Sequence, residues 1–258
     1  MARFGSPAAL AWLCSHGAHT DSVELKALLS CAAGPAAEAL TGRTAPSWSV
    51  RQTYLLDTGS LELLRAGIEV RLRRRARGRY DLAVAAHRTG GAPARATPPG
   101  VRVELDVVPG ALWQDLEVRN EVDPAAAAAV VAGTAESREL LSPAQWSWAC
   151  RGGDRTVDED RLGDLRVHGP LDVSRVKVAA TGLGLRRADL EHFRFPSGRE
   201  LLELSTHCGP RDVSATATAF ERLLDERGVP IAPDYRTRTS VWRDELSGGA
   251  TGRPGRPG

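Results

Sequence analysis

The residues best suited to chemistry lie between positions 68 and 75, where charged and apolar side chains alternate. The charged positions are Glu69, Arg71, Arg73 and Arg75, and Ile68, Val70 and Leu72 lie between them. Because neighbouring side chains of a strand point to opposite faces, this strand would carry three arginines and one carboxylate on one face. The positive charges in such a row repel one another unless they are solvated or bind a multiply charged anion. The stretch therefore predicts a strand whose charged face is either solvated or an anion-binding surface.

The same alternation recurs in three other stretches of the chain. Their charged positions are Glu24 and Lys26, then Arg102, Glu104 and Asp106, then Arg175 and Lys177. A solvated sheet face would explain any one of these strands by itself. A closed antiparallel β-barrel with a polar lumen explains all of them, and helices would then cover its apolar outer face. We therefore predict an α+β fold in which the strands enclose a charged tunnel and the helices pack outside.

The order of motifs around the arginine-rich strand resembles that of a known superfamily. Tyr54-Leu55-Leu56-Asp57-Thr58 is followed by Leu63-Leu64-Arg65-Ala66-Gly67 and then by Val70-Arg71-Leu72-Arg73. This succession resembles the core of CYTH-domain proteins, which form the triphosphate tunnel metalloenzyme superfamily. The superfamily includes thiamine triphosphatases, inorganic triphosphatases and class IV adenylyl cyclases, so the resemblance implies a triphosphate as the ligand.

Two further motifs agree with this resemblance. In the family the first strand carries an ExExK motif with metal-binding glutamates and a phosphate-binding lysine, and here the positions read Ser22, Glu24 and Lys26. A hairpin near the end of the chain, with Glu191 before the turn at 196–198 and Leu202-Glu203-Leu204-Ser205 after it, matches a second family motif. The segment 236–239, which contains Arg238, resembles the family's terminal element with arginine in place of lysine.

The resemblance assigns roles to eleven residues. A triphosphate carries about four negative charges and requires several cations together with a divalent metal. The predicted catalytic residues are Lys26 and Glu24. The predicted triphosphate-binding residues are Lys26, Arg71, Arg73, Arg102, Arg175, Lys177 and Arg238. The predicted metal ligands are Glu24, Glu104, Glu191 and Glu203, which offer hard oxygens to Mg²⁺ or Mn²⁺.

Three functions are compatible with these residues. The first is metal-dependent hydrolysis of inorganic triphosphate, thiamine triphosphate or a nucleoside triphosphate. The second is a polyphosphate- or nucleotide-binding protein that has lost turnover, and Ser22 favours it because the serine removes one anionic metal ligand. The third is cyclisation by an internal ribose hydroxyl, as in the cyclases, for which the sequence shows no adenine-recognition motif.

The organisation of the chain follows from its turn and cap signals. Residues 1–20 are predicted to be a variable leader, 21–246 a single tunnel domain and 247–258 a disordered tail, and a polar linker at 151–162 divides the domain into two halves. Strands are predicted at 21–30, 49–56, 68–75, 80–87, 101–108, 165–169, 173–179, 188–195 and 199–205. Helices are predicted at 35–40, 61–66, 123–133, from 142 onward and at 212–227.

Composition limits the remaining possibilities. The 258 residues carry a formal net charge of +2, which gives no sign of a nucleic-acid-binding protein. The apolar run at 8–14 is too short to span a bilayer, and the four cysteines show no metal-ligand spacing. We expect a cytoplasmic protein, monomeric or homodimeric, whose partner is a small-molecule triphosphate and not a membrane.

Overall fold

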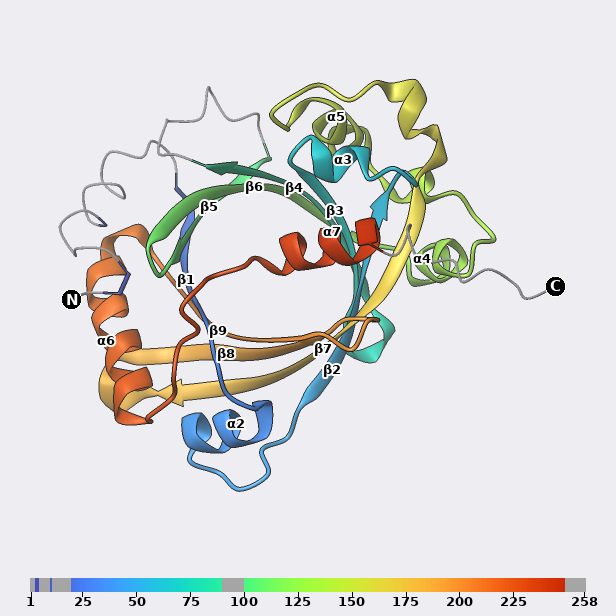
Figure 1. The fold of residues 1–258 in the computed structure, drawn as a ribbon. Coiled ribbons are helices and arrows are strands. Elements are labelled where there is room, and N and C mark those ends of the chain that lie inside the picture. Colours follow the sequence, from blue (N-terminus) through green and yellow to red (C-terminus); the bar gives the residue numbers. More distant parts are fainter. Residues whose placement is uncertain (1–2, 5–9, 11–19, 90–99, 249–258) are drawn as a thin grey trace.

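The computed structural model describes residues 3–4, 10, 20–89 and 100–248. Nearly all of the predicted leader lies outside these residues, and so does the predicted tail from residue 249 onward. Nine strands in the described part close into one barrel in the order β1-β5-β6-β4-β3-β2-β7-β8-β9 (Figure 1). The strands are β1 Ser22–Leu28, β2 Ser49–Asp57, β3 Ile68–Arg74, β4 Tyr80–Thr89, β5 Arg102–Val108, β6 Ala111–Val122, β7 Arg166–Ala180, β8 Leu185–Arg194 and β9 Glu200–Cys208.

One pair of strands corrects the expectation of a wholly antiparallel barrel. β1 and β5 run parallel, with Ser22 opposite Glu104 and Glu24 opposite Asp106, whereas the other eight pairings are antiparallel. A ring with an odd number of strands cannot alternate direction all the way round, so one parallel pair is unavoidable. The barrel is therefore mixed, and its closure and polar lumen confirm the prediction.

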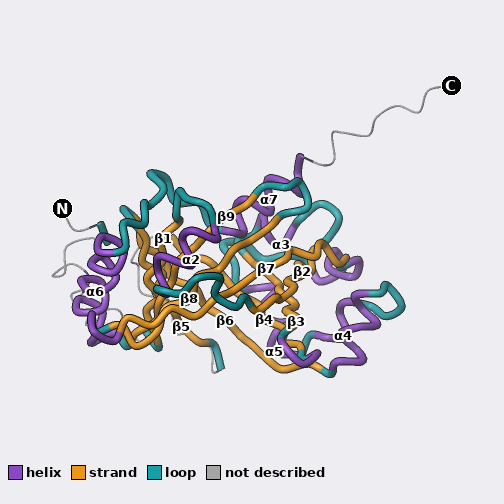
Figure 2. Tube along the Cα trace, turned by 90° about the horizontal axis from the view of Figure 1, so that it is seen from below, coloured by secondary structure: helices purple, strands orange, loops and turns teal. Residues whose placement is uncertain are grey.

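The alternation in sequence determines which side chains face the lumen. In β3 the apolar residues Ile68, Val70 and Leu72 are buried on the outer face of the barrel. They belong to a cluster that includes residues of α4 (Pro124–Val131) and α5 (Pro143–Arg151). On the other side of the barrel, α2 (Ala33–Thr41) packs against β7, and α6 (Val213–Glu226) packs against β1, β8 and β9. Figure 2 shows α6 and α4 at opposite ends of the molecule. Burial of this apolar surface stabilises the closed ring.

The sequence prediction missed β6. The chain turns at Gly110, which has φ +77°, and β6 then pairs with both β4 and β5. Its residues alternate like those of the other strands, with Asp115, Glu117 and Arg119 in the cavity lining and Leu116 and Val118 buried on the other side. The strand adds three charged side chains to the lumen.

β7 is one long strand, where two separate strands were predicted. It runs through Gly169-Pro170, a cis peptide, opposite a register shift between Thr53 and Leu55 in β2. Gly169 has φ +121°, and a Cβ there would lie 3.1 Å from Trp242 and 3.2 Å from the Thr53 carbonyl oxygen. Glycine therefore allows the strand to continue through this crowded point.

Asp57 has a structural role in the Tyr-x-x-Asp-Thr motif. Its carboxylate accepts hydrogen bonds from the backbone N–H groups of Thr58, Leu63 and Leu64, at 2.7, 2.9 and 2.9 Å. These bonds fix the short helix α3 (Glu62–Arg65) at the end of β2. The motif thereby sets the point at which β3 begins.

The last helix corrects the expectation that all helices pack outside the barrel. α7 (Arg238–Gly248) lies across the ring of strands (Figure 1) and buries Val241 and Trp242. The buried partners are inward-facing residues such as Leu55, Leu171 and Phe193. One part of the barrel interior is therefore apolar and filled by α7. Among the described residues, no helix is long and apolar enough to cross a membrane.

Candidate functional site: a charged cavity inside the barrel

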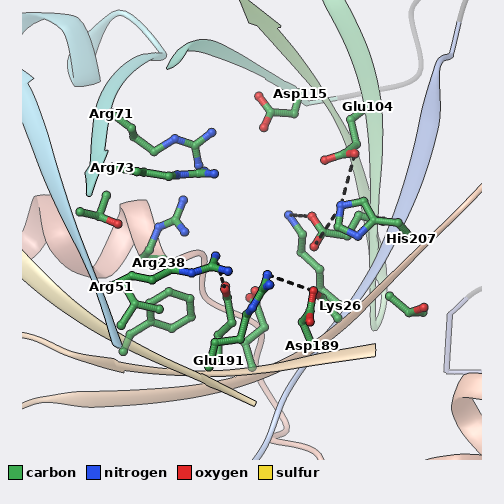
Figure 3. A pocket seen from close by; sticks show the side chains of 18 of the residues that line it. Lys26, Arg51, Arg71, Arg73, Glu104, Asp115, Asp189, Glu191, His207 and Arg238 are labelled. Atoms are coloured by element: carbon green, nitrogen blue, oxygen red, sulfur yellow. Dashed lines mark hydrogen bonds and ion pairs between the residues drawn. The ribbon is translucent and has the colours of Figure 1, made fainter. Parts of the chain in front are cut away.

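A cavity of about 650 Å³ occupies the barrel lumen. Its walls come from every strand except β4 and from the start of α7, and ten basic and seven acidic side chains line it (Figure 3). The basic residues are Lys26, Arg51, Arg71, Arg73, Arg75, Arg102, Arg119, Arg175, Arg187 and Arg238. The acidic residues are Glu24, Glu104, Asp115, Glu117, Asp189, Glu191 and Glu203. The excess of positive charge suits a polyanion.

Ten of the eleven predicted site residues line this cavity. Lys177 is the exception, because it is exposed and does not contribute to the cavity wall. It lies on β7 two residues beyond Arg175 and in register with Asp189, whose side chain does line the cavity. The period-two pattern assigns Lys177 to the same face as Arg175, but it could not show that this side chain is exposed and lies outside the cavity wall.

One wall of the cavity is dominated by arginines. Arg71 is buried, with its Nη2 2.8 Å from Glu117 and its Nε 3.2 Å from Glu69. Arg73 lies beside it and forms no hydrogen bond or ion pair with any residue that the structure describes. Burial and the nearby charges of Arg71, Arg238 and Arg119 lower the pKa of Arg73 to about 9. Arg73 is therefore a lumenal cation without an anionic partner among the described residues.

Glu69 holds this arginine wall together. Its side chain is 0% exposed and lies 3.2 Å from the Arg71 Nε and 3.6 Å from an Arg238 Nη2. It also accepts a hydrogen bond from the Thr239 hydroxyl and lies 3.2 Å from His87 Nε2. Although burial raises the pKa of Glu69, the surrounding cations lower it well below the usual value. Glu69 thus fastens the first turn of α7 to β3.

The opposite wall carries the carboxylates and Lys26. The Lys26 ammonium group lies 2.8 Å from Glu24 and 2.6 Å from Asp106. Although burial raises the pKa of Glu24, Lys26 and His207 lower it to about 2. Lys26 is consequently held in the lumen by two carboxylates.

Two of the four predicted metal ligands lie together. One ligand atom each from Glu24, Glu104 and His207 lies within 4.8 Å of the others. Burial raises the pKa of Glu104, and repulsion by the neighbouring carboxylate of Glu24 raises it further. A divalent cation would relieve this repulsion, and the oxygen and imidazole donors fit such an ion.

The other two predicted ligands have different surroundings. Glu203 accepts a hydrogen bond of 2.7 Å from the Tyr235 hydroxyl, and burial and Glu24 raise its pKa to about 7 against the opposing effect of Lys26. Glu191 lies opposite Glu203 in register, but its carboxylate is 3.8 Å from Arg51. Glu203 therefore belongs to the Lys26 side of the cavity, whereas Glu191 faces the arginines.

The sequence analysis missed several lining residues. They are Arg51, Arg119, Arg187, Asp115, Glu117, Asp189 and His207. The alternation of Asp115, Glu117 and Arg119 is a readable signal for an inward face. For His207 and Arg187 no motif was available, because their positions near the barrel mouth follow from strand register alone.

No protein-family model and no curated protein sequence matches this chain. Solved structures do resemble it. A proposed adenylyl cyclase of Hippeastrum, HpAC1, for which a dominant triphosphatase activity is reported, has a TM-score of 0.62 at 18% identity over 88% of this chain and 96% of its own. A proposed adenylate cyclase of Bacillus halodurans has a TM-score of 0.55 at 13% identity over 86% of this chain and 96% of its own. These likenesses confirm the predicted CYTH-type fold.

Proposed function

We propose that this chain, which has the fold of CYTH-type triphosphate tunnel proteins, hydrolyses a triphosphate inside its barrel with the help of Mg²⁺ or Mn²⁺. The observation that carries the proposal is the set of charges around Arg73. Arg73 is a lumenal arginine without an ion-pair partner among the described residues, and three other arginines surround it. Such an arrangement costs free energy in the empty protein, and an anion with several charges would offset that cost.

Both walls of the cavity would contribute contacts to the bound triphosphate. The guanidinium groups of Arg73, Arg71 and Arg238 can donate paired hydrogen bonds to phosphoryl oxygens on one side of the lumen. Lys26 can reach the same chain of phosphates from the opposite wall, because Glu24 and Asp106 hold its ammonium group in place. A linear anion that spans the cavity would contact both walls, which favours a triphosphate over a single phosphate.

Hydrolysis requires an attacking water in line with the bond that breaks. The carboxylates of Glu104 and Glu203 line the same part of the cavity as Lys26 and can accept hydrogen bonds from that water and orient it. A bound divalent ion would neutralise charge on the phosphoryl oxygens. The arginine wall would stabilise the negative charge that shifts to the leaving phosphate.

Two alternatives use the same cavity. Ser22 leaves the first strand with one acidic ligand fewer than the family motif, which favours a binding protein without turnover. Adenylyl cyclase activity is compatible with the names of the structural neighbours, since the same cradle could position a ribose hydroxyl for attack.

Phosphate release would test the proposal. The protein would be assayed with inorganic triphosphate, thiamine triphosphate and ATP, each with Mg²⁺ or Mn²⁺, and cyclic AMP would be measured alongside. We expect phosphate release from at least one substrate, and Arg73→Gln should lower kcat/KM by about tenfold or more. Arg222→Gln, an exposed arginine on α6 outside the barrel, is the matched control. Tight binding without turnover would favour the binding protein, and cyclic AMP as the main product would favour the cyclase.

A further inference from the structure

The chain between α6 and the first turn of α7 reaches both walls of the cavity. It is anchored beside the end of β1, where Ile231 forms an isolated β-bridge with Leu29. From there it passes across the ring of strands to α7 (Figure 1). Arg238 belongs to the arginine wall, whereas Tyr235, three residues earlier, contacts Glu203 on the Lys26 side. One short stretch therefore serves two opposite walls.

The ammonium group of Lys26 has one N–H donor left for a ligand. An ammonium group has three N–H bonds, and Glu24 at 2.8 Å and Asp106 at 2.6 Å accept two of them. Glu203 is close enough for its charge to act on Lys26. In the part of the chain that the structure describes, however, Glu203 and Lys26 form no ion pair. The third N–H is therefore not taken by this carboxylate.

Two aromatic side chains hold the carboxylates that flank Lys26. The Tyr235 hydroxyl donates a 2.7 Å hydrogen bond to Glu203 Oε2. The Tyr235 ring packs against the Trp113 ring, with centroids 5.6 Å apart. Trp113 Nε1 in turn donates at 2.9 Å to Asp106 Oδ2, the oxygen that Lys26 also contacts. The stacked pair thus fixes one carboxylate on each of the two strands that neighbour β1, namely β9 and β5.

Without the tyrosine hydroxyl, Glu203 would gain most from a direct contact with Lys26. A carboxylate in the lumen that has lost its hydrogen-bond donor is stabilised by the cation of the same wall. That contact would occupy the remaining N–H of Lys26 and add a third negative charge beside it. A phosphoryl oxygen would then have to displace Glu203 before it could reach the ammonium group.

We propose that Tyr235 is a positioning residue for Lys26: it holds Glu203 aside and so keeps one N–H of the ammonium group available to a phosphoryl oxygen. Trp113 supports this role by fixing the tyrosine ring. The inference rests on the proposed function and deepens it, because Tyr235 does not line the cavity yet controls how one wall binds the anion.

Calorimetric titration with inorganic triphosphate in the presence of a chelator would test this role without turnover. The titrations would be made at a pH of about 8.5, where Glu203 is ionised, since burial raises its pKa to about 7. Tyr235→Phe keeps the ring and removes the hydroxyl, and it should weaken triphosphate binding by about fivefold or more. In a Glu203→Gln background the same change should alter the affinity by less than about twofold, because the competing charge is gone.

Tyr54→Phe is the matched control, because the Tyr54 hydroxyl bonds Gln52 and its ring packs on the outer face of the barrel. This variant should bind triphosphate as the wild-type protein does. An equal loss of affinity for Tyr235→Phe in both backgrounds would mean that the tyrosine only supports the fold, and would overturn the inference.

The ammonium groups themselves give a second readout that needs no triphosphate. Lys26 and Lys177 are the only lysines of the chain, so labelling of lysine with nitrogen-15 gives two side-chain signals. The Lys26 signal should shift in Tyr235→Phe, while the Lys177 signal stays in place. An unchanged Lys26 signal would contradict the inference. A wild-type protein that neither binds nor hydrolyses triphosphate would instead contradict the proposed function, and the lysine spectrum would still show whether Tyr235 positions Lys26.

Discussion

Individual charged side chains in the lumen differ in their effect on the stability of the fold. Arg71 is paired with two carboxylates, whereas Arg73, two residues further along the same strand, is paired with none of the described residues. Removal of a paired buried arginine destabilises the fold, because its carboxylate partners are left buried without a cation. An unpaired arginine weakens the fold, and in the proposed function it would bind the substrate. Stability and anion binding should therefore separate at these two positions.

Replacement of each arginine by glutamine tests this separation. Arg73→Gln should leave the free energy of unfolding unchanged or raise it, because it removes repulsion, yet it should weaken binding of inorganic triphosphate by about tenfold or more. Arg71→Gln should lower the free energy of unfolding by about 3 kcal/mol, because Glu69 and Glu117 lose a partner. Urea unfolding and calorimetric titration in the presence of a chelator would measure both. A large loss of stability in Arg73→Gln would contradict this reading.

His87 should make stability depend on pH. Burial lowers its pKa, but Asp115 and Glu69 outweigh burial and Arg71, and the net shift is upward. A raised pKa in the folded state means that protonated His87 stabilises the protein fully below its usual pKa of about 6.5. This contribution is lost as the pH rises through the folded-state pKa.

Urea unfolding at a series of pH values from 6 to about 9 would measure the effect. The free energy of unfolding of the wild-type protein should fall across this range relative to His87→Gln. If the two proteins show the same pH dependence, the imidazole is not held between the two carboxylates as the structure shows.

At the scale of elements, α7 is the part that the sequence predicted least well. Its amphipathic pattern is weak, and its burial depends on Leu55, Leu171 and Phe193, which are far away in sequence. Only its first residue, Arg238, carried a motif signal. By contrast, the strands with strict alternation were predicted within a few residues, because a two-residue period is a local property. β6 shares that period and was readable, but no local signal in the sequence shows that it pairs with both β4 and β5 in the barrel.

Weakening the contact between α7 and the barrel should affect the arginine wall. Trp242→Ala removes a buried ring and should cost about 3–5 kcal/mol of local stability, so that the helix detaches and Arg238 leaves the lumen. Amide exchange at 238–248 should rise and triphosphate binding should weaken. Trp242→Phe keeps most of the ring, and the Trp242 Nε1 has no hydrogen-bond partner in the described chain, so this variant should behave almost as the wild-type protein. Equal protection of α7 in both variants would contradict its role.

At the scale of the whole molecule, nine strands bring together charges that are scattered over more than two hundred residues. Ten of the eleven residues that the resemblance assigned line one cavity, so the motifs were enough to identify side chains that the fold brings together. The parallel β1–β5 pair, the lumenal position of His207 and the exposure of Lys177 were not predictable, because they depend on how the ring closes and where its lumen ends. Closure also separates an arginine wall from a carboxylate wall (Figure 3).

The most direct test of this account is an experimental structure of the protein with a non-hydrolysable triphosphate analogue and Mn²⁺. We predict that the analogue lies inside the barrel, with its phosphoryl oxygens against Arg73 and Arg238 on one wall and Lys26 on the other. Mn²⁺ should contact Glu24, Glu104 and His207. An analogue bound outside the barrel, or a structure in which Lys26, Arg73 and Glu203 point into bulk water on separate surfaces, would contradict the account.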